Sequence, residues 1–213
     1  MIKQTYLQHP GGQYFYRIHG IKIDRLVVWN ALKSYLHDML DKCPDAYFND
    51  NGPRCSMAKF KLADLDLKSI AGHEVNSLTK NALKYSNEDT AHSKVESYML
   101  EHDGNTIAVE VPLWLHANEI GNFKELFKDT KPLTGHVDVL RIEDGKIWIW
   151  DYKPNAHREK FAATQIYFYT LMMSKRTGIG MEHFRCGYFD DKNAFVYKPE
   201  LKMSGSYELK DFI

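Results

Sequence analysis

The sequence predicts an α/β fold in which helices pack against a sheet that contains an antiparallel hairpin. From residue 87 onward, segments with apolar residues at helical spacing alternate with runs rich in β-branched and apolar residues. Two pairs of those runs are separated by short turn-forming segments, as in hairpins. With 213 residues, 44% of them hydrophobic, the chain can bury a substantial core without disulfide or metal support.

The first 85 residues are expected to form a mostly helical extension. Residues 23–40 place leucine and aromatic side chains close to helical spacing, which predicts an amphipathic helix. Residues 42–56 are dense in Pro, Gly, Asn and Asp, which predicts a loop.

The pattern becomes more regular after this extension. Residues 87–90, Asn-Glu-Asp-Thr, offer caps for a helix that should end near Asp103. Residues 106–115 follow as a strand, because β-branched and apolar residues dominate them. The runs 133–142 and 146–153 then flank an Asp-Gly pair, which is a strong hairpin signal.

The last third of the chain continues this alternation. Helical spacing returns after Asn155 and is expected to stop at Thr177 and Gly178. The runs 183–189 and 194–198 flank a polar turn and predict a second hairpin.

Composition limits the classes of function. The chain carries 28 basic and 28 acidic residues, so its charge gives no support for a protein that coats nucleic acid nonspecifically, and any grip on nucleic acid must be local. Cys43, Cys55 and Cys186 are odd in number and far apart, which predicts neither a disulfide framework nor a metal knuckle. No signal-peptide pattern and no membrane-spanning apolar run is present, so we expect a soluble, cytoplasmic protein.

The two strands of the first hairpin carry the candidate chemistry. Because residues two apart in a strand share a face, Asp151 and Lys153 should emerge side by side at the end of an apolar strand. Asp138 lies on the preceding strand, and the hairpin can bring it close to Asp151. Two close carboxylates repel each other, so the pair favours a hard divalent cation such as Mg²⁺ or Mn²⁺. A simple cross-strand ion pair with Lys153 is the alternative, and Asp-x-Lys alone does not exclude it.

Three further features accompany these residues in a fixed order along the chain. His92 lies on the preceding predicted helix, and Gly135 precedes Asp138 by three residues. Gln165 and Tyr169 lie one turn apart on the later helix, so they share a face. An amphipathic core helix does not explain Gln165 within an apolar stripe, because a buried amide needs partners.

Taken together, these residues resemble the RecB-like branch of the PD-(D/E)XK nuclease superfamily. That pattern consists of a helix-borne histidine, a Gly-x-(I/V)-Asp strand, an Asp-x-Lys strand and a Gln-x-x-x-Tyr helix, and the similarity covers roughly residues 86 to 200. The resemblance implies a restriction-endonuclease-like αβββαβ core over residues 86–213, with a central mixed sheet flanked by helices and residues 1–85 as the helical extension. It also implies phosphodiester hydrolysis with one or two metal ions.

The resemblance assigns roles position by position. Metal ligands would be the side chains of His92, Asp138 and Asp151 and the carbonyl of Tyr152, while Lys153 would be the catalytic lysine. Gln165 and Tyr169 would brace the metal-site strand and touch the nucleic-acid backbone.

The last metal ligand is open at this stage. Glu96 shares a helix face with His92, and Glu110 lies on the strand where many family members carry an acid. His73 can also be aligned to the family histidine, although it leaves a longer gap before the first strand. His136 shares a strand face with Asp138, which makes it a further candidate for the same cleft.

The expected substrate is DNA, as single strands or duplex ends. Arg158 and Lys160 lie in a short basic segment beside the proposed chemistry, which suggests phosphate positioning, with an ordinary solvated loop as the alternative. By resemblance, we expect an exonuclease of DNA repair, recombination or replication; a catalytically idle module that binds DNA or protein is the alternative. A protein partner or homo-oligomer remains open.

The sequence lacks the motifs for two features that some members of this branch carry. Only Cys186 lies after the Gln-x-x-x-Tyr helix, so an iron–sulfur cluster is not supported, and no P-loop of a fused helicase motor is present.

Overall fold

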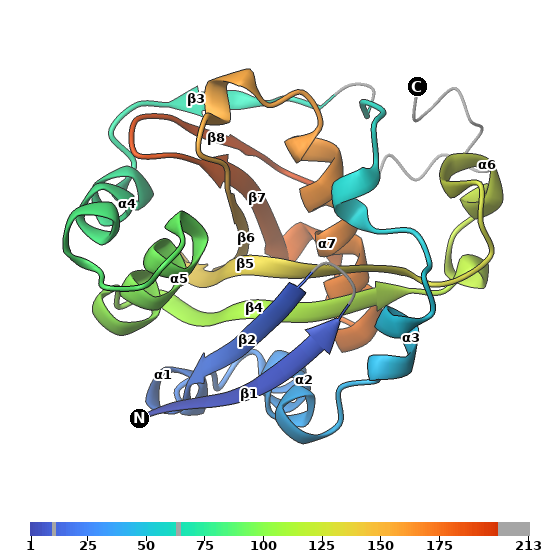
Figure 1. Ribbon diagram of the computed structural model, residues 1–213, viewed down its shortest axis with the longest axis horizontal. Helices are drawn as coiled ribbons and strands as arrows, with labels where there is room; N and C mark the ends of the chain where they lie inside the picture. The colour runs from blue at the N-terminus through green and yellow to red at the C-terminus, as the bar shows by residue number, and fades with distance from the viewer. Residues whose placement is uncertain (10–11, 63–64, 200–213) are drawn as a thin grey trace.

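A mixed eight-stranded sheet forms the centre of the protein in the computed structural model (Figure 1), which describes residues 1–9, 12–62 and 65–199. Its strand order is β1-β2-β4-β5-β6-β7-β8-β3, and neighbours run antiparallel except for the parallel pair β6 and β7. The strands are β1 (Ile2–His9), β2 (Gly12–His19), β3 (Lys68–Ile70), β4 (Thr106–Leu115), β5 (Leu133–Glu143), β6 (Lys146–Tyr152), β7 (Phe184–Phe189) and β8 (Ala194–Tyr197).

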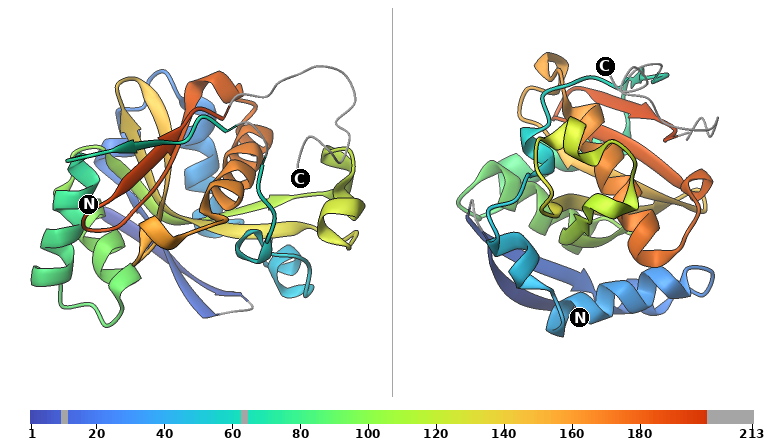
Figure 2. Two further views of the ribbon diagram at one scale, coloured as in Figure 1. Left: turned by 90° about the horizontal axis from the view of Figure 1, so that it is seen from above. Right: turned by 90° about the vertical axis from the view of Figure 1, so that its right-hand side faces the viewer.

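Helices cover both faces of this sheet (Figure 2). They are α1 (Gly20–Asp24), α2 (Asn30–Asp41), α3 (Asp45–Asn49), α4 (Glu74–Tyr85), α5 (Ala91–His102), α6 (Phe123–Phe127) and α7 (Ala162–Thr177). The side chains of α7 and α2 share one hydrophobic cluster with one face of the sheet, and those of α4 and α5 share a second cluster with the other face. The α/β class with a central mixed sheet is therefore confirmed.

The secondary structure predicted after residue 87 is present in the predicted order. Helix α5 begins after Thr90, whose side chain accepts a hydrogen bond from the backbone N–H of Ser93, as an N-cap does. The hairpin of β5 and β6 turns at Asp144 and Gly145, with φ of 48° and 67°, the left-handed conformation that a tight hairpin turn requires. Helix α7 ends at Gly178, also left-handed, with φ of 70°.

The first 19 residues differ from the expected helical extension. Residues 2–9 and 12–19 form the antiparallel strands β1 and β2, which extend the central sheet where Arg17 pairs with Val109 and Ile18 with Ala108. Helical spacing begins only after these two strands, in α1 and α2. Sequence periodicity did not indicate β1 because this strand lies at the sheet edge and has only two buried residues, Leu7 and His9, so its apolar alternation is weak. Residues 200–213 of the expected core lie outside the described residues.

A buried arginine ties the helical layer to the sheet. Arg141 on β5 is fully buried, and its guanidinium donates hydrogen bonds to Asp103 at 2.8 Å, Glu143 at 2.6 Å and Glu74 at 2.5 Å. These three acids come from the end of α5, from β5 and from the start of α4. The network therefore fixes both helices of one face against the strand that carries Asp138.

No helix in the described part of the chain is both long and apolar enough to cross a membrane.

Replacing Arg141 by Met should destabilise the fold strongly. The variant leaves Asp103, whose side chain is 1% exposed, without its cation, and an unpaired buried charge of this kind costs about 3–5 kcal/mol of unfolding free energy. Urea denaturation followed by circular dichroism measures this loss. Lys42→Ala, which removes the exposed ion pair with Asp38, is the control and should leave the transition midpoint unchanged. Equal midpoints for the Arg141 variant and the native protein would contradict the structural importance of the network.

Candidate functional site

Two adjacent strands bring Asp138 and Asp151 together. Val139 pairs with Trp150, so the next position in the antiparallel register places Asp138 beside Asp151. The backbone N–H of Tyr152 donates a 2.8 Å hydrogen bond to Oδ2 of Asp138, which fixes that carboxyl group at the end of β6. The convergence predicted from the hairpin is therefore present in the structure.

Strands β4 and β5 both change, at paired positions, the sheet face on which their side chains pack. Val109 and Val139 belong to the hydrophobic cluster under α4 and α5, whereas Val111 and Val137 belong to the cluster under α7. Residues two apart ordinarily share a strand face, so alternation is broken at the residue between them on each strand. On β4 that residue is Glu110, whose φ of 53° lies in the left-handed region. A non-glycine residue there is strained, and such strain concentrates at functional sites.

Asp151 is held from two sides. Its Oδ2 forms a 2.6 Å ion pair with Nζ of Lys153, and its Oδ1 accepts a 3.2 Å hydrogen bond from Nε2 of Gln165 on α7. The Gln165 amide also donates to the hydroxyl of Tyr169 at 2.8 Å. A Cβ on Gly135 would lie 2.3 Å from the Tyr169 ring, so only glycine leaves room for this contact. Gly135, Gln165 and Tyr169 therefore act as one support behind Asp151.

Helix α5 supplies two side chains on the other side of the carboxyl pair. Nε2 of His92 lies 3.1 Å from the carbonyl oxygen of Tyr152 and 4.0 Å from Oδ2 of Asp138. Glu96, one turn later, is buried, and its side chain is hydrogen-bonded to that of Glu110. The second oxygen of Glu96, Oε1, is buried without a hydrogen-bond partner. Glu96 and Glu110 thus both lie at the site, together with His92.

Burial, together with neighbouring negative charge, raises the pKa values of Glu96, Glu110 and Asp138. Burial, reinforced by the charge of Asp151, raises the pKa of Asp138 well above its usual range. Burial also raises the pKa of Glu110 to about 7, and burial together with the charge of Glu110 raises the pKa of Glu96 well above normal. Burial alone would lower the pKa of the Lys153 ammonium, but the attraction of Asp151 and Asp138 outweighs it and the pKa is raised. Lys153 is therefore a firmly protonated ammonium group.

The residues fit a hard divalent cation. Carboxylate oxygens and a backbone carbonyl are the ligands that Mg²⁺ and Mn²⁺ prefer, and the orphaned Oε1 of Glu96 is a buried acceptor with no donor. The groups are not drawn into one coordination shell, because Asp151 is paired with Lys153 and Asp138 with the Tyr152 N–H. A cation would have to compete with these partners.

Comparison with known families agrees with this arrangement of acids and lysine. The model of the PD-(D/E)XK nuclease superfamily matches residues 30–212, most of the chain. The chain belongs to the PD-(D/E)XK nuclease superfamily. Membership indicates a hydrolase of nucleic acids that uses divalent metal, and the RecB-like branch within the superfamily remains our prediction. No curated protein and no solved structure matched the chain.

Two histidines considered from the sequence lie elsewhere. His73 caps α4 by accepting a hydrogen bond from the N–H of Val75, and its Nε2 pairs with Glu143 at 3.2 Å. His136 is buried and bonds to His9 at 2.9 Å, with its ring stacked on Tyr14, so it packs toward β1 and β2. His136 does not point toward the carboxyl groups, although residues two apart usually share a strand face. The alternation of β5 is broken after His136, before the strand reaches Val139.

The basic segment lies on the surface beside the site. Arg158 and Lys160 are exposed in the connection between β6 and α7, and that connection is anchored where the N–H of Ala156 donates a 2.9 Å hydrogen bond to Asp190. Gln165 and Tyr169 are only 8% and 4% exposed, so they offer little surface for nucleic acid.

One cation near the site was missed by the sequence reasoning. The charge of Arg17 on β2 lowers the pKa values of both Glu96 and Glu110, and its guanidinium bonds to Ser97 on α5. Arg17 lies far from these residues along the chain and carries no motif, so only strand pairing could find it.

The stability of the metal-free protein should depend on pH through Glu110. Its pKa rises from an ordinary 4.5 to about 7 on folding, so the folded state holds a proton that the unfolded chain has lost between these values. This contribution to stability is complete below about pH 4.5 and is lost as the pH rises through 7. Glu110→Gln should therefore melt above the native protein at pH 8 in EDTA, by more than the roughly 2–4 °C that 1 kcal/mol produces, and the difference should shrink at pH 5. A pH-independent difference would contradict a buried, proton-binding Glu110.

Proposed function

We propose that the protein is a divalent-metal-dependent DNA nuclease whose site is formed by Asp138, Asp151 and Lys153. The observation that carries the proposal is the placement of the two aspartates on neighbouring strands, with the Lys153 ammonium 2.6 Å from Asp151. A pure binding module has no need of repelling carboxylates beside a lysine. Membership of the nuclease superfamily gives independent support.

The carboxylates of Asp138 and Asp151 and the carbonyl of Tyr152 would hold the metal, with His92, Glu96 and Glu110 available to complete its surroundings. Mg²⁺ or Mn²⁺, when bound, supplies Lewis-acid activation of water and of the scissile phosphate. Glu96 is the preferred candidate among the three, because its Oε1 is buried and lacks a donor.

Lys153 is assigned a role as a donor to the reacting phosphate. In the metal-free protein the attraction of Asp151 and Asp138 raises the pKa of Lys153, which suits a hydrogen-bond donor. An ammonium group held beside the ion can stabilise the negative charge that develops on a phosphate in the transition state. Its ion pair with Asp151 sets its position.

Gln165 and Tyr169 are assigned as positioning residues, and Arg158 and Lys160 as contacts to the nucleic-acid backbone. Gln165 and Tyr169 are buried and are connected to Asp151 by hydrogen bonds, so they can hold Asp151 in place better than they can contact the substrate. The members of the second pair are exposed cations next to the end of β6, where a substrate strand would lie.

The DNA substrate and the cellular process are inferred from family resemblance. By resemblance to the RecB-like pattern, we infer that the substrate is DNA with a free end, that cleavage is exonucleolytic, and that the process served is DNA repair, recombination or replication. A partner protein or oligomer that presents the DNA is compatible with this assignment.

Removal of the proposed catalytic groups should abolish cleavage. We expect Asp151→Asn and Lys153→Met each to lower the rate on end-labelled DNA by at least about 100-fold with Mg²⁺ or Mn²⁺, and EDTA to stop the native enzyme, because transition-state stabilisation is lost. Asp144→Asn and Lys146→Met are matched controls at the opposite end of the same hairpin, and both should cleave at the native rate. Single-stranded, duplex and closed circular DNA are compared with RNA of equal sequence.

Each outcome decides one part of the proposal. Cleavage of linear but not circular DNA supports exonuclease action, whereas discrete internal fragments would replace it by endonuclease action. Preference for RNA would overturn the DNA assignment. Native protein and variants that bind DNA equally and are equally inactive would favour the catalytically idle module.

Removing the exposed cations Arg158 and Lys160 should weaken DNA binding without changing the rate of the chemical step. Arg158→Ala/Lys160→Ala should raise KM with kcat unchanged, because uniform binding is lost. The slope of log affinity against log salt concentration should fall by about 2, roughly one unit for each phosphate contact. Lys68→Ala/Lys84→Ala, a pair of exposed cations on β3 and α4, is the control. An unchanged slope in the first double variant would remove this segment from the interface.

A further inference from the structure

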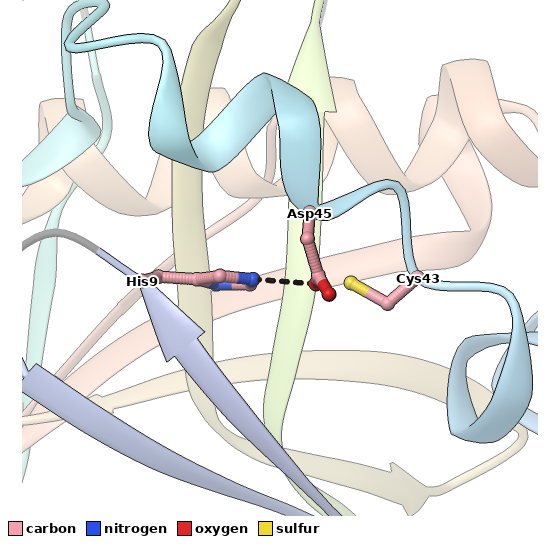
Figure 3. A group of neighbouring side chains, drawn as sticks. All are labelled: His9, Cys43 and Asp45. Atoms are coloured by element: carbon pink, nitrogen blue, oxygen red, sulfur yellow. Dashed lines mark hydrogen bonds and ion pairs between the residues drawn. The ribbon is translucent and has the colours of Figure 1, made fainter.

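A second cluster of metal-binding side chains lies outside the nuclease site. The Nε2 of His9, the Sγ of Cys43 and a carboxylate oxygen of Asp45 all lie within 4.8 Å of one another (Figure 3). No other such group of three His, Cys, Asp or Glu side chains was found among the described residues. Figure 3 shows the side chains of His9, at the end of β1, Cys43, in the connection between α2 and α3, and Asp45, at the start of α3, gathered in one place.

The backbone around Pro44 prepares two of these ligands. The N–H of Asp45 donates a 2.9 Å hydrogen bond to the carbonyl of Cys43, and Pro44 has φ of −80° and ψ of 70°. These values describe an inverse γ-turn, which brings the residues before and after its centre close together. Because the proline ring restricts φ, little further ordering is needed to present both side chains.

The third ligand is held by its surroundings. The side chain of His9 is 1% exposed, and its ring stacks on Phe48 of α3 with centroids 4.0 Å apart. Its Nδ1 lies 2.9 Å from Nε2 of His136, so the other ring nitrogen is directed at Oδ1 of Asp45, also at 2.9 Å. A histidine ligand commonly has this arrangement, in which an outer partner holds one nitrogen and leaves the other for the metal.

We propose that His9, Cys43 and Asp45 form a transition-metal site, for Zn²⁺ in the first place, that is separate from the nuclease centre. Sulfur, imidazole nitrogen and one carboxylate are the ligands of a borderline-soft ion, whereas Mg²⁺ and Mn²⁺ prefer oxygen. The side chain of Asp45 is 57% exposed, so solvent can reach the ion and supply a fourth ligand. On binding, the Cys43 thiol loses its proton to solvent and the ion takes the place of the proton on Nε2 of His9, which replaces the hydrogen bond to Asp45. The His9 ring stays neutral by carrying its proton on Nδ1 and donating it to Nε2 of His136, whose own proton moves to its Nδ1.

The bound ion would join segments that are otherwise connected only by packing and hydrogen bonds. It would link the end of β1 to the start of α3, and through His9 to His136 on β5, the strand that also carries Asp138. An ion that binds only the folded state stabilises it in proportion to the logarithm of its free concentration. Strands β1 and β2 would therefore be fastened to the nuclease core by metal.

Cobalt substitution in the full-length protein tests the site independently of nuclease activity. Co²⁺ bound to a thiolate gives a sulfur-to-metal charge-transfer absorption, and none of the proposed nuclease ligands contains sulfur. We expect one equivalent of Co²⁺ to produce this band, Zn²⁺ to displace it, and Zn²⁺ to raise the melting temperature. Cys43→Ser should abolish the band, and Asp45→Asn should weaken Co²⁺ affinity by at least about the 10-fold that loss of even an outer partner typically costs.

Matched variants separate the site from other thiols. Cys55→Ser and Cys186→Ser, which alter the two buried cysteines elsewhere, should keep the band. Cys43 and Asp45 are not fully buried, so their variants should fold, as circular dichroism in EDTA would verify. Absence of the band in the folded native protein, or its persistence in Cys43→Ser, would overturn the proposal. Asp138→Asn/Asp151→Asn should retain the band, so failure of the proposed nuclease function leaves this result unaffected.

Discussion

Repulsion between buried carboxyl groups is the constraint on which the site depends. Glu96, Glu110, Asp138 and Asp151 come from four different elements. Burial and neighbouring negative charge raise the pKa values of the first three, because a low-dielectric interior disfavours several unpaired anions. In the metal-free protein, the free-energy cost of burying these negative charges is lowered in two ways. The raised pKa values of Glu96 and Glu110 favour their uncharged forms, and Lys153 forms an ion pair with Asp151. A divalent cation bound between the carboxylates would reduce the repulsion further.

Neighbouring groups hold the carboxyl groups in place despite their mutual repulsion. Asp138 is held by a backbone N–H and Asp151 by the amide of Gln165, so neither carboxyl group is free to turn away. The helices on the opposite face are fixed to the same strand by Arg141. Glu110 keeps a left-handed backbone conformation within a strand, which only a well-packed environment can maintain. Rigid support thus makes an unfavourable charge distribution persist, and that is what a metal site requires.

The two proposed metal sites differ in chemistry and are joined by one strand. The nuclease site offers oxygen ligands for a hard ion, and the cluster of His9, Cys43 and Asp45 offers mixed ligands for a softer one. His136 contacts the second site and lies two residues before Asp138 on β5. Strands β1 and β2 are therefore contributors to the nuclease domain, through the pairing of β2 with β4 and through this contact.

The sequence by itself determined the order of the long helices and strands after residue 87 and the convergence of Asp138 with Asp151, because hairpin signals and strand alternation act over short distances. The family followed from the resemblance of the motifs that these elements carry. Strands β1 and β2, the placement of Arg17 and the divergence of His136 from Asp138 were decided only by tertiary structure. Pairing between β2 and β4 joins residues some ninety positions apart, and the break in alternation at Glu110 arises from how two layers pack. Local periodicity contains no information about either, since both depend on contacts that exist only once the sheet has formed.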